Sequence, residues 1–163
     1  IPRTVFYFII TKYVNMTTVN IYLTFNGECE AAFMFYHSVF GGEFAVFSRF
    51  KEMPPQEGMP PMPAEAGEKI MHVSLPVSKE TILMGSDTGG EWAKHFAKGT
   101  NFSVSISTDS QAEADRLFNG LSAGGQVTMP LSKTFWNSYF GMFTDKFGIQ
   151  WMLSFDEKPA HAG

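Results

Sequence analysis

The run Val19-Asn20-Ile21-Tyr22-Leu23-Thr24-Phe25 alternates apolar with polar residues, and Asn26-Gly27 and a helical pattern over residues 28–40 follow it. The same order returns in Asn101-Phe102-Ser103-Val104-Ser105-Ile106-Ser107, which precedes Thr108-Asp109-Ser110 and a helical pattern that ends at Ala123. Both helical patterns end in a Gly-Gly pair, which permits the left-handed turn that often follows a helix. A half-domain that occurs twice predicts a duplication whose two copies close around a shared cavity.

The two strand patterns predict which residues face that cavity, because every second residue of a strand lies on the same face. In the first strand the apolar face is Val19, Ile21, Leu23 and Phe25, and the polar face is Asn20, Tyr22 and Thr24. In the second strand the apolar face is Phe102, Val104 and Ile106, and the polar face is Asn101, Ser103, Ser105 and Ser107. Each apolar face is expected to receive its own helix. The polar faces, which contain neither carboxylate nor histidine, are therefore expected to line the cavity.

Both helical patterns carry an apolar stripe with the spacing of one helix face. The stripes are Ala32, Phe35, Tyr36, Val39 and Phe40 in the first helix, and Ala114, Leu117, Phe118 and Leu121 in the second. Asn26 is expected to cap the first helix, and Asp109 or Ser110 the second.

Three further strand-like runs follow each helix, so each half has the order βαβββ and the fold class is α+β. The runs are 44–50, 69–77 and 81–85 in the first half, and 126–132, 135–143 and 150–155 in the second. Residues 51–68 interrupt the first half and are rich in proline, which lacks the N–H donor that a sheet interior needs. This segment is expected to be an extended loop outside the sheet, either a lid over the cavity or a hairpin tip.

The chain divides into four parts. Residues 1–15 are expected to be an extension outside the functional fold, or else an added edge strand supplied by the apolar run 5–10. That run is far shorter than the roughly 20 residues of a membrane span. Residues 16–99 form the first module, 100–156 the second and 157–163 a tail.

Composition narrows the functional classes. A net charge of -4 without a Lys/Arg cluster argues against nucleic-acid binding. The single cysteine, Cys29, excludes an internal disulfide and agrees with a cytoplasmic location. Cys29 lies at a helix start, where a thiolate can be stabilised. Because no His or Lys is adjacent in the sequence, the pattern favours a small helix-start residue instead. We expect no membrane partner.

Several motifs resemble one known family. They are the strand–turn–helix from Tyr22 to Gly27 with Ala31, Ala32 and Tyr36; the run Ile82-Leu83-Met84-Gly85-Ser86-Asp87; and Thr134-Phe135-Trp136 with residues 144–152. This pattern resembles the PhnB-like branch of the vicinal-oxygen-chelate superfamily. Members of this branch are often labelled demethylubiquinone methyltransferase-like. The superfamily also includes glyoxalases, extradiol dioxygenases and bleomycin-resistance proteins. The resemblance covers residues 19–155 and implies two βαβββ modules in a curved, cup-like sheet, and a homodimer.

The resemblance also implies where a metal site would lie. The superfamily's metalloenzymes take ligands from the first and last strands of each module. Here those positions fall on Asn20 and Asn101, on Met152, and near Leu83 or Met84. An amide is a weak neutral ligand and a thioether suits copper rather than Zn, Mn, Ni or Fe. We therefore expect no metal cofactor in the inherited site.

His72 is the candidate catalytic residue. In the strand pattern, His72 and Ser74 share one face, and Met71, Val73 and Leu75 share the other. If the apolar face packs on a helix, His72 points into the cup. There it acts as a general base, contacts a ligand, or is a histidine satisfied by polar neighbours. Asp87 and Glu91 are possible partners of His72. Both lie in the connector over residues 86–99, where a solvated surface role is favoured.

Aromatic side chains are the remaining candidates for the cavity lining. Trp136, Tyr139, Trp151 and Tyr22 either line the cavity or belong to the core. The expected ligand-binding set is Asn20, Tyr22, Thr24, His72, Ser74, Asn101, Ser103, Ser105, Trp136, Tyr139 and Met152. Two functions remain open: a metal-free protein that binds a small molecule in its cup, and a small-metabolite enzyme that uses His72 or a divalent metal bound in a non-standard way.

Overall fold

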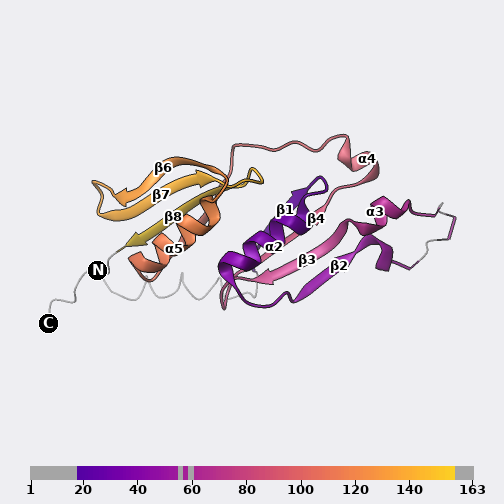
Figure 1. The fold of residues 1–163 in the computed structure, drawn as a ribbon, viewed down its shortest axis with the longest axis horizontal. Helices are drawn as coiled ribbons and strands as arrows, with labels where there is room; N and C mark the ends of the chain where they lie inside the picture. The colour runs from indigo at the N-terminus through magenta and orange to yellow at the C-terminus, as the bar shows by residue number, and fades with distance from the viewer. Residues whose placement is uncertain (1–17, 55–56, 59–60, 157–163) are drawn as a thin grey trace, which may run out of the picture.

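Two four-stranded sheets form the framework of the molecule. The computed structural model describes residues 18–54, 57–58 and 61–156 (Figure 1). The first sheet has the strand order β1-β4-β3-β2, and the second has the equivalent order β5-β8-β7-β6. The strands are β1 (Ile21–Phe25), β2 (Val46–Arg49), β3 (Ile70–Pro76), β4 (Ile82–Asp87), β5 (Val104–Ser107), β6 (Gln126–Lys133), β7 (Ser138–Thr144) and β8 (Gln150–Asp156). In each sheet the first strand pairs in parallel with the last, and the other neighbours are antiparallel. The α+β fold of two βαβββ modules is confirmed.

Each module carries one long helix on its sheet. The helices are α2 (Cys29–Phe40) and α5 (Gln111–Ser122). The predicted apolar stripe of α5 is fully buried. In α2, Ala32 and Tyr36 are buried as predicted, but so is Phe33, whose ring lies against Gly85 of β4. The buried surface of α2 is wider than one stripe because the helix packs on its own sheet and also against the second module.

The first strand of each module is shorter than its alternating pattern. Pairing begins at Ile21, opposite Leu83, and at Val104, opposite Trp151. Val19 and Phe102, which the pattern assigned to the buried faces, are 92% and 53% exposed. They precede the paired part of their strands, so no helix covers them.

The described part of the proline-rich segment, residues 51–54, 57–58 and 61–68, stays outside the sheets as predicted, but it is not wholly extended. A 3-10 turn, η2 (Phe50–Glu52), and a short helix, α3 (Ala64–Glu68), occupy its two ends. Lys51 and Glu68 join these ends through a 2.7 Å ion pair. A further short helix, α4 (Gly90–Ala93), interrupts the connector between the modules.

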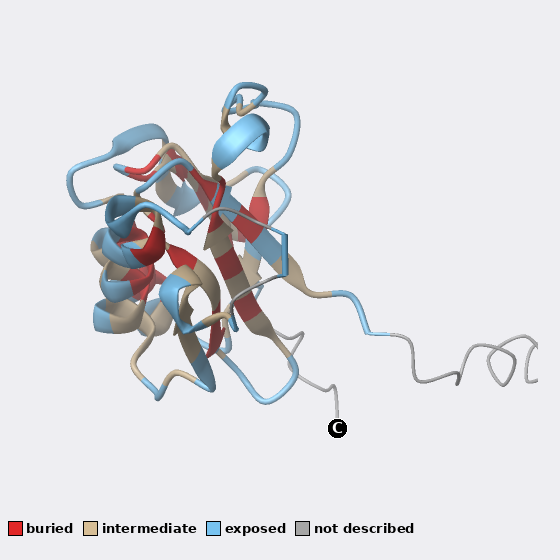
Figure 2. Ribbon diagram, turned by 90° about the vertical axis from the view of Figure 1, so that its right-hand side faces the viewer, coloured by how far each residue is buried: buried red, intermediate tan, exposed pale blue. Residues whose placement is uncertain are grey.

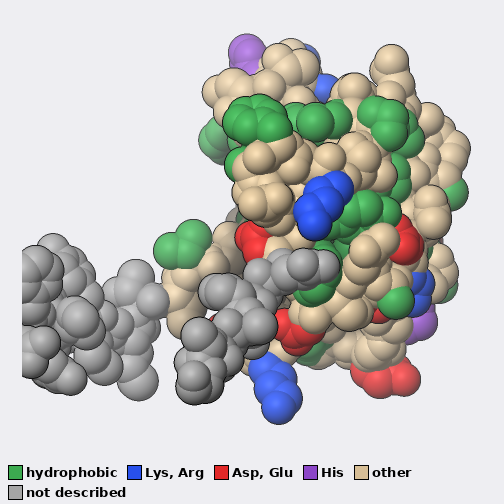
Figure 3. All heavy atoms as spheres, turned by 90° about the vertical axis from the view of Figure 1, so that its left-hand side faces the viewer, with side chains coloured by type: hydrophobic (Ala, Val, Ile, Leu, Met, Phe, Trp, Pro, Cys, Tyr) green, Lys and Arg blue, Asp and Glu red, His purple; other side chains and the backbone are tan. Residues whose placement is uncertain are grey.

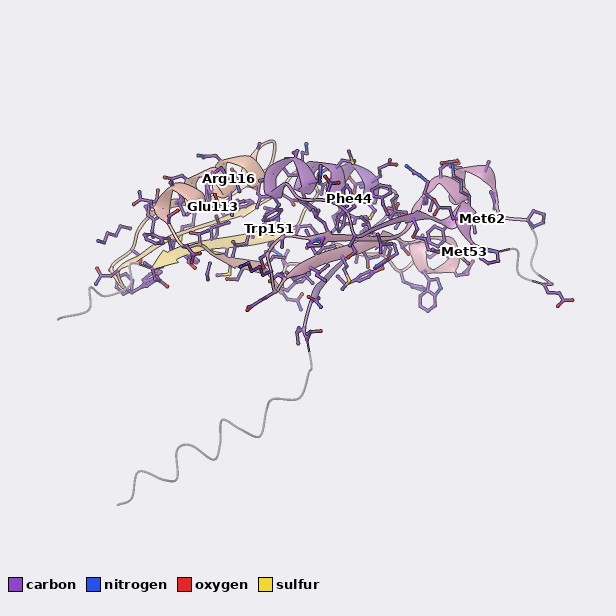
Figure 4. The ribbon with its side chains drawn as sticks, turned by 90° about the horizontal axis from the view of Figure 1, so that it is seen from below. Phe44, Met53, Met62, Glu113, Arg116 and Trp151 are labelled. Atoms are coloured by element: carbon purple, nitrogen blue, oxygen red, sulfur yellow. The ribbon has the colours of Figure 1, made fainter. Side chains whose placement is uncertain are left out.

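The core lies between the long helices and the sheets, where buried residues follow one face of the strands (Figure 2). Both long helices lie on the same side of the two sheets (Figure 4). On α5, Gly120 allows close approach of α2, because a Cβ there would lie 2.8 Å from Val39. Arg116 of α5 adds a 2.6 Å hydrogen bond to the Val39 carbonyl. Neither long helix covers the opposite face of either sheet.

Two expectations concern the ends of the chain. The extension over residues 1–15 and the tail over 157–163 lie outside the described residues. None of the described helices is long and apolar enough to cross a lipid bilayer.

Candidate functional site

The uncovered face of the first sheet carries mostly polar side chains, and we call it the open face. Leu23 and Phe25 of β1 are buried on the helix side, so Tyr22 and Thr24 project to the other side. Strand register places Met84 between Tyr22 and Ser74, Ser86 beside Thr24, and Ser48 beside His72. The open face therefore includes Tyr22, Thr24, Ser48, His72, Met84 and Ser86, together with the buried Ser74 and the apolar Val46 and Ile82.

His72 lies on the open face together with Tyr22. The Tyr22 hydroxyl is 3.4 Å from His72 Nδ1, and the two rings stack with centroids 5.8 Å apart. His72 is half-buried and Tyr22 is 49% exposed, so the pair is accessible from solvent. An imidazole beside a phenol can accept or donate a proton or hold a polar ligand group.

Asp87 does not belong to this face, and its expected surface role is wrong. It ends β4, is 5% exposed, and accepts hydrogen bonds from the backbone N–H groups of Gly27, Cys29 and Ile70 at 2.8 to 3.0 Å. Asp87, rather than Asn26, therefore accepts hydrogen bonds from the backbone N–H groups at the start of α2. The second helix starts as predicted, with Ser110 accepting from Glu113 N–H at 3.2 Å.

Cys29 is a core residue. Its side chain is completely buried, and burial raises the pKa of the thiol, with the nearby Asp87 carboxylate adding to the shift. A reactive thiolate requires the opposite shift. The small-residue interpretation of Cys29 therefore fits the structure.

A pocket of about 490 Å³ opens at one end of the open face, and we call it the end pocket. Its floor includes Thr24 and Ser86 of the open face. Its walls come from η2, α3 and α4 with their flanking residues, and the complete lining is Thr24, Phe50, Met62, Ala66, Lys69, Ser86, Asp87, Thr88, Gly89, Gly90 and Trp92. Met53 and Met62, both within the proline-rich segment, lie at this end of the molecule (Figure 4). The pocket therefore combines an apolar wall with hydroxyl groups.

The second sheet holds the other predicted site residues. Ser105 pairs with Met152, and both lie on the side opposite the buried Trp151. Asn101 and Ser103 precede β5, and Asn101 is exposed. The structure therefore divides the predicted binding set between two sheets, and Thr24 is the member of that set that lines the end pocket.

The aromatic residues predicted to line the cavity lie in different environments in the structure. Trp136 lies in the β6–β7 turn, 51% exposed, with its ring 6.1 Å from that of Phe140. Tyr139 instead donates a 2.7 Å hydrogen bond to Asp115 of α5, which places it on the helix side. Trp151 is 1% exposed and belongs to the core.

The residues at the inherited metal positions do not fit a Zn, Mn, Ni or Fe ion. Asn20 Oδ1 accepts a long hydrogen bond of 3.4 Å from Ile82 N–H, while Met84 and Met152 offer thioethers. Leu83, the other candidate position, is buried on the helix side. Among the residues that the structure describes, no three His, Cys, Asp or Glu side chains gather.

A second buried carboxylate, Asp145, joins the two modules, and the sequence analysis missed this role. It accepts hydrogen bonds from the Tyr36 hydroxyl at 2.7 Å and from Trp151 Nε1 at 2.9 Å. The backbone N–H groups of Phe147 and Ile149 also donate hydrogen bonds to the Asp145 carboxylate. Burial raises the pKa of the Tyr36 phenol, and the Asp145 charge adds to this shift. No local sequence pattern indicates the contact between Asp145 and Tyr36, which lie 109 residues apart.

Comparisons with known proteins agree with this fold. Residues 17–154 match the family described as 3-demethylubiquinone-9 3-methyltransferase. Protein YjdN of Escherichia coli (strain K12) is 29% identical over 138 residues, which cover 82% of this chain and 91% of YjdN.

Solved structures extend the comparison. Protein PA1353 from Pseudomonas aeruginosa is 40% identical with a TM-score of 0.72, over 87% of this chain and 99% of that one. The fosfomycin resistance protein FosX from Listeria monocytogenes is 12% identical with a TM-score of 0.57, over 90% of this chain and 96% of FosX, which shows the fold alone. Residues 17–154 span most of the chain, and the chain therefore belongs to the family described as 3-demethylubiquinone-9 3-methyltransferase.

Proposed function

We propose that this protein binds a small apolar or aromatic molecule at the open face and the end pocket, without a metal ion. The observation that carries the proposal is the end pocket itself, whose volume of about 490 Å³ lies in the range typical of ligand sites. Phe50, Met62 and Trp92 would bury the apolar body of the ligand. Thr24 and Ser86 would orient its polar groups, and His72 with Tyr22 extends this polar surface along the sheet.

A thermal-shift screen tests the proposal. We expect aromatic alcohols such as 2-naphthalenemethanol to raise the melting temperature of the purified protein equally with and without EDTA. Trp92→Ala should remove most of this shift because it deletes an 82% exposed indole from the pocket wall. Phe135→Ala is the matched control, since Phe135 is a 94% exposed aromatic residue in the second module.

Two results would count against this function. Loss of the shift in EDTA would show that a metal is required. A shift that survives Trp92→Ala but disappears in Phe135→Ala would move the site to the second module.

A second candidate function is acid–base catalysis on a small metabolite, and the His72–Tyr22 contact of 3.4 Å favours it. Methylglyoxal with glutathione is a suitable first substrate pair, assayed in EDTA and with added Zn²⁺, Ni²⁺ or Mn²⁺. If His72 is the base, His72→Ala abolishes turnover and preserves the fold, while the exposed His95→Ala leaves turnover unchanged. Equal turnover in both variants would exclude His72 as the base.

We also propose that the protein is a homodimer. β2 and β6 are edge strands of their sheets, and unpaired edges favour association. The end of the molecule formed by the second module carries surface hydrophobic side chains (Figure 3). In the same module, Val127, Phe135 and Trp136 are 44% or more exposed. Sedimentation should give twice the monomer mass, and Val127→Lys on β6 should weaken the dimer. A monomer at all concentrations would refute the proposal.

The lone cysteine supports a cytoplasmic location. Cys29 is buried and unpaired, which agrees with a reducing compartment. Cell fractionation with a compartment marker tests this assignment.

A further inference from the structure

The end pocket contains one positively charged side chain. Lys69, which precedes β3, lines the pocket and is half-buried. The two other cations nearby are already paired: Arg49 with Glu30 at 2.6 Å and Lys51 with Glu68 at 2.7 Å. Within residues 18–54, 57–58 and 61–156, no carboxylate lies within ion-pair distance of Lys69.

The one carboxylate in the pocket lining does not supply that partner. Asp87 is buried and uses both oxygens to accept backbone hydrogen bonds, from Gly27 and Cys29 through Oδ1 and from Ile70 through Oδ2. Two of these donors belong to the start of α2, where the helix dipole stabilises negative charge. The Asp87 charge is thus held by the backbone, and Lys69 is left as a cation without an acidic partner in the pocket.

The rest of the lining determines what kind of anion fits. Phe50, Met62, Ala66 and Trp92 are apolar, and Trp92 is 82% exposed. Apolar walls reduce the solvent screening of a charge pair and favour burial of hydrocarbon. A small inorganic anion would leave these walls uncovered. A molecule with a flat apolar body and one carboxylate matches both features.

We infer that the end pocket selects an aromatic or aliphatic carboxylate, whose anion pairs with Lys69 and whose apolar body packs against Phe50, Met62 and Trp92. This inference rests on the proposed function and adds the charge of the ligand to it. A charge-assisted hydrogen bond to the ligand makes Lys69 a specificity-determining residue. The hydroxyls of Thr24 and Ser86 lie on the floor of the same pocket and can donate to the second carboxylate oxygen.

Calorimetric titration with two matched probes tests the inference. 2-Naphthoate and 2-naphthalenemethanol share the same ring system and differ mainly in charge. We expect the full-length protein to bind naphthoate about tenfold more tightly than the alcohol. Added salt should reduce that preference.

Substitutions at Lys69 then separate charge from shape. Lys69→Met keeps the length of the side chain and should bring the affinity for naphthoate down to that for the alcohol. Lys69→Arg should retain most of the preference, and Lys79→Met, at an exposed lysine in the β3–β4 turn, should leave both affinities unchanged.

The possible failures are distinguishable. Equal binding of both probes by the unmodified protein, or an unchanged preference in Lys69→Met, would overturn the carboxylate inference and keep the proposed function. Binding of neither probe would overturn both. Circular dichroism of each variant shows whether a lost affinity reflects a lost fold.

Discussion

Asp87 shows how one buried side chain can organise three segments that lie far apart in the sequence. Its carboxylate binds the turn before α2, the first turn of α2 and the start of β3. The end pocket is built on the same residue, since Asp87 is part of its lining. Removing the carboxylate would leave three N–H groups without their acceptor.

Asp87→Ala should therefore lower the free energy of unfolding by about 3 kcal/mol, because buried donors that lose their partner keep their desolvation cost. Urea unfolding followed by circular dichroism measures the change. Asp109→Ala, at an exposed carboxylate before α5, should stay within about 0.5 kcal/mol of the unmodified protein. Equal effects of the two substitutions would contradict the role of Asp87.

Cys29 gives stability a defined dependence on pH. Its pKa is raised in the folded protein, so above about pH 8.5 the unfolded chain loses the thiol proton while the folded protein keeps it. Stability is then fully present below that pH and falls as pH rises, by up to about 1.4 kcal/mol per pH unit. Cys29→Ala should flatten the decline between pH 8.5 and pH 10. An identical slope in both proteins would show that Cys29 does not titrate on unfolding.

Among the elements, β4 has little room for a larger side chain at Gly85. Gly85 lies where the Phe33 ring of α2 meets the sheet, and a Cβ there would come within 2.5 Å of that ring and 2.8 Å of the Leu23 carbonyl oxygen. The backbone contact leaves little room for relaxation. The spacing between α2 and its sheet therefore depends on this glycine.

Gly85→Ala should destabilise the protein by about 2 kcal/mol through overpacking. Gly89→Ala is the control, since a Cβ at Gly89 would have no heavy atom within 4 Å. Melting temperatures of the two variants, measured side by side, provide the comparison. A Gly85→Ala variant as stable as Gly89→Ala would mean that α2 can shift away from β4.

The elements were largely predictable from the sequence because alternation and helical spacing are local signals. Alternation placed Tyr22 and Thr24 opposite Leu23 and Phe25, as the structure has them. The strand predicted over residues 135–143 begins only at Ser138 in the structure, after a turn in which Asn137 has a φ of 65°. The face on which each residue of a strand lies can be predicted reliably only when the first paired residue of that strand is known.

At the scale of the whole molecule, the contact between modules depends on a small set of polar bonds around the long helices. Tyr36 of α2 reaches Asp145 of the second module, while Arg116 of α5 reaches the Val39 carbonyl at the end of α2. These bonds connect residues that belong to different modules. Packing of Phe35 and Phe40 of α2 against the rings of Phe147 and Trp151 adds apolar contact between the modules.

Tyr36→Phe removes the hydroxyl that joins the modules and should cost about 1.5 kcal/mol in unfolding free energy. Tyr22→Phe, which alters an exposed hydroxyl on the open face, should cost less than about 0.5 kcal/mol. Chemical denaturation of both variants distinguishes them. If Tyr36→Phe were neutral, the Tyr36–Asp145 bond would not stabilise the module contact.

The candidate site was only partly predictable from the sequence. His72 and Tyr22 were identified by alternation within single strands. The end pocket was not, because its walls come from Phe50, Met62 and Trp92, which lie in separate short helices or turns. The buried roles of Asp87 and Asp145 depend on donors that lie up to 109 residues away. Such contacts carry no local pattern.

The three tryptophans allow the most direct test of ligand binding at the end pocket, because each occupies a different environment. Trp92 lines the end pocket, Trp136 lies in the β6–β7 turn, and Trp151 is in the core. Their indole N–H signals can be followed by NMR during titration with 2-naphthalenemethanol in EDTA. We expect the Trp92 signal to move while those of Trp136 and Trp151 stay in place. Movement of the Trp136 signal alone, or of none, would contradict a metal-free binding site in the first module.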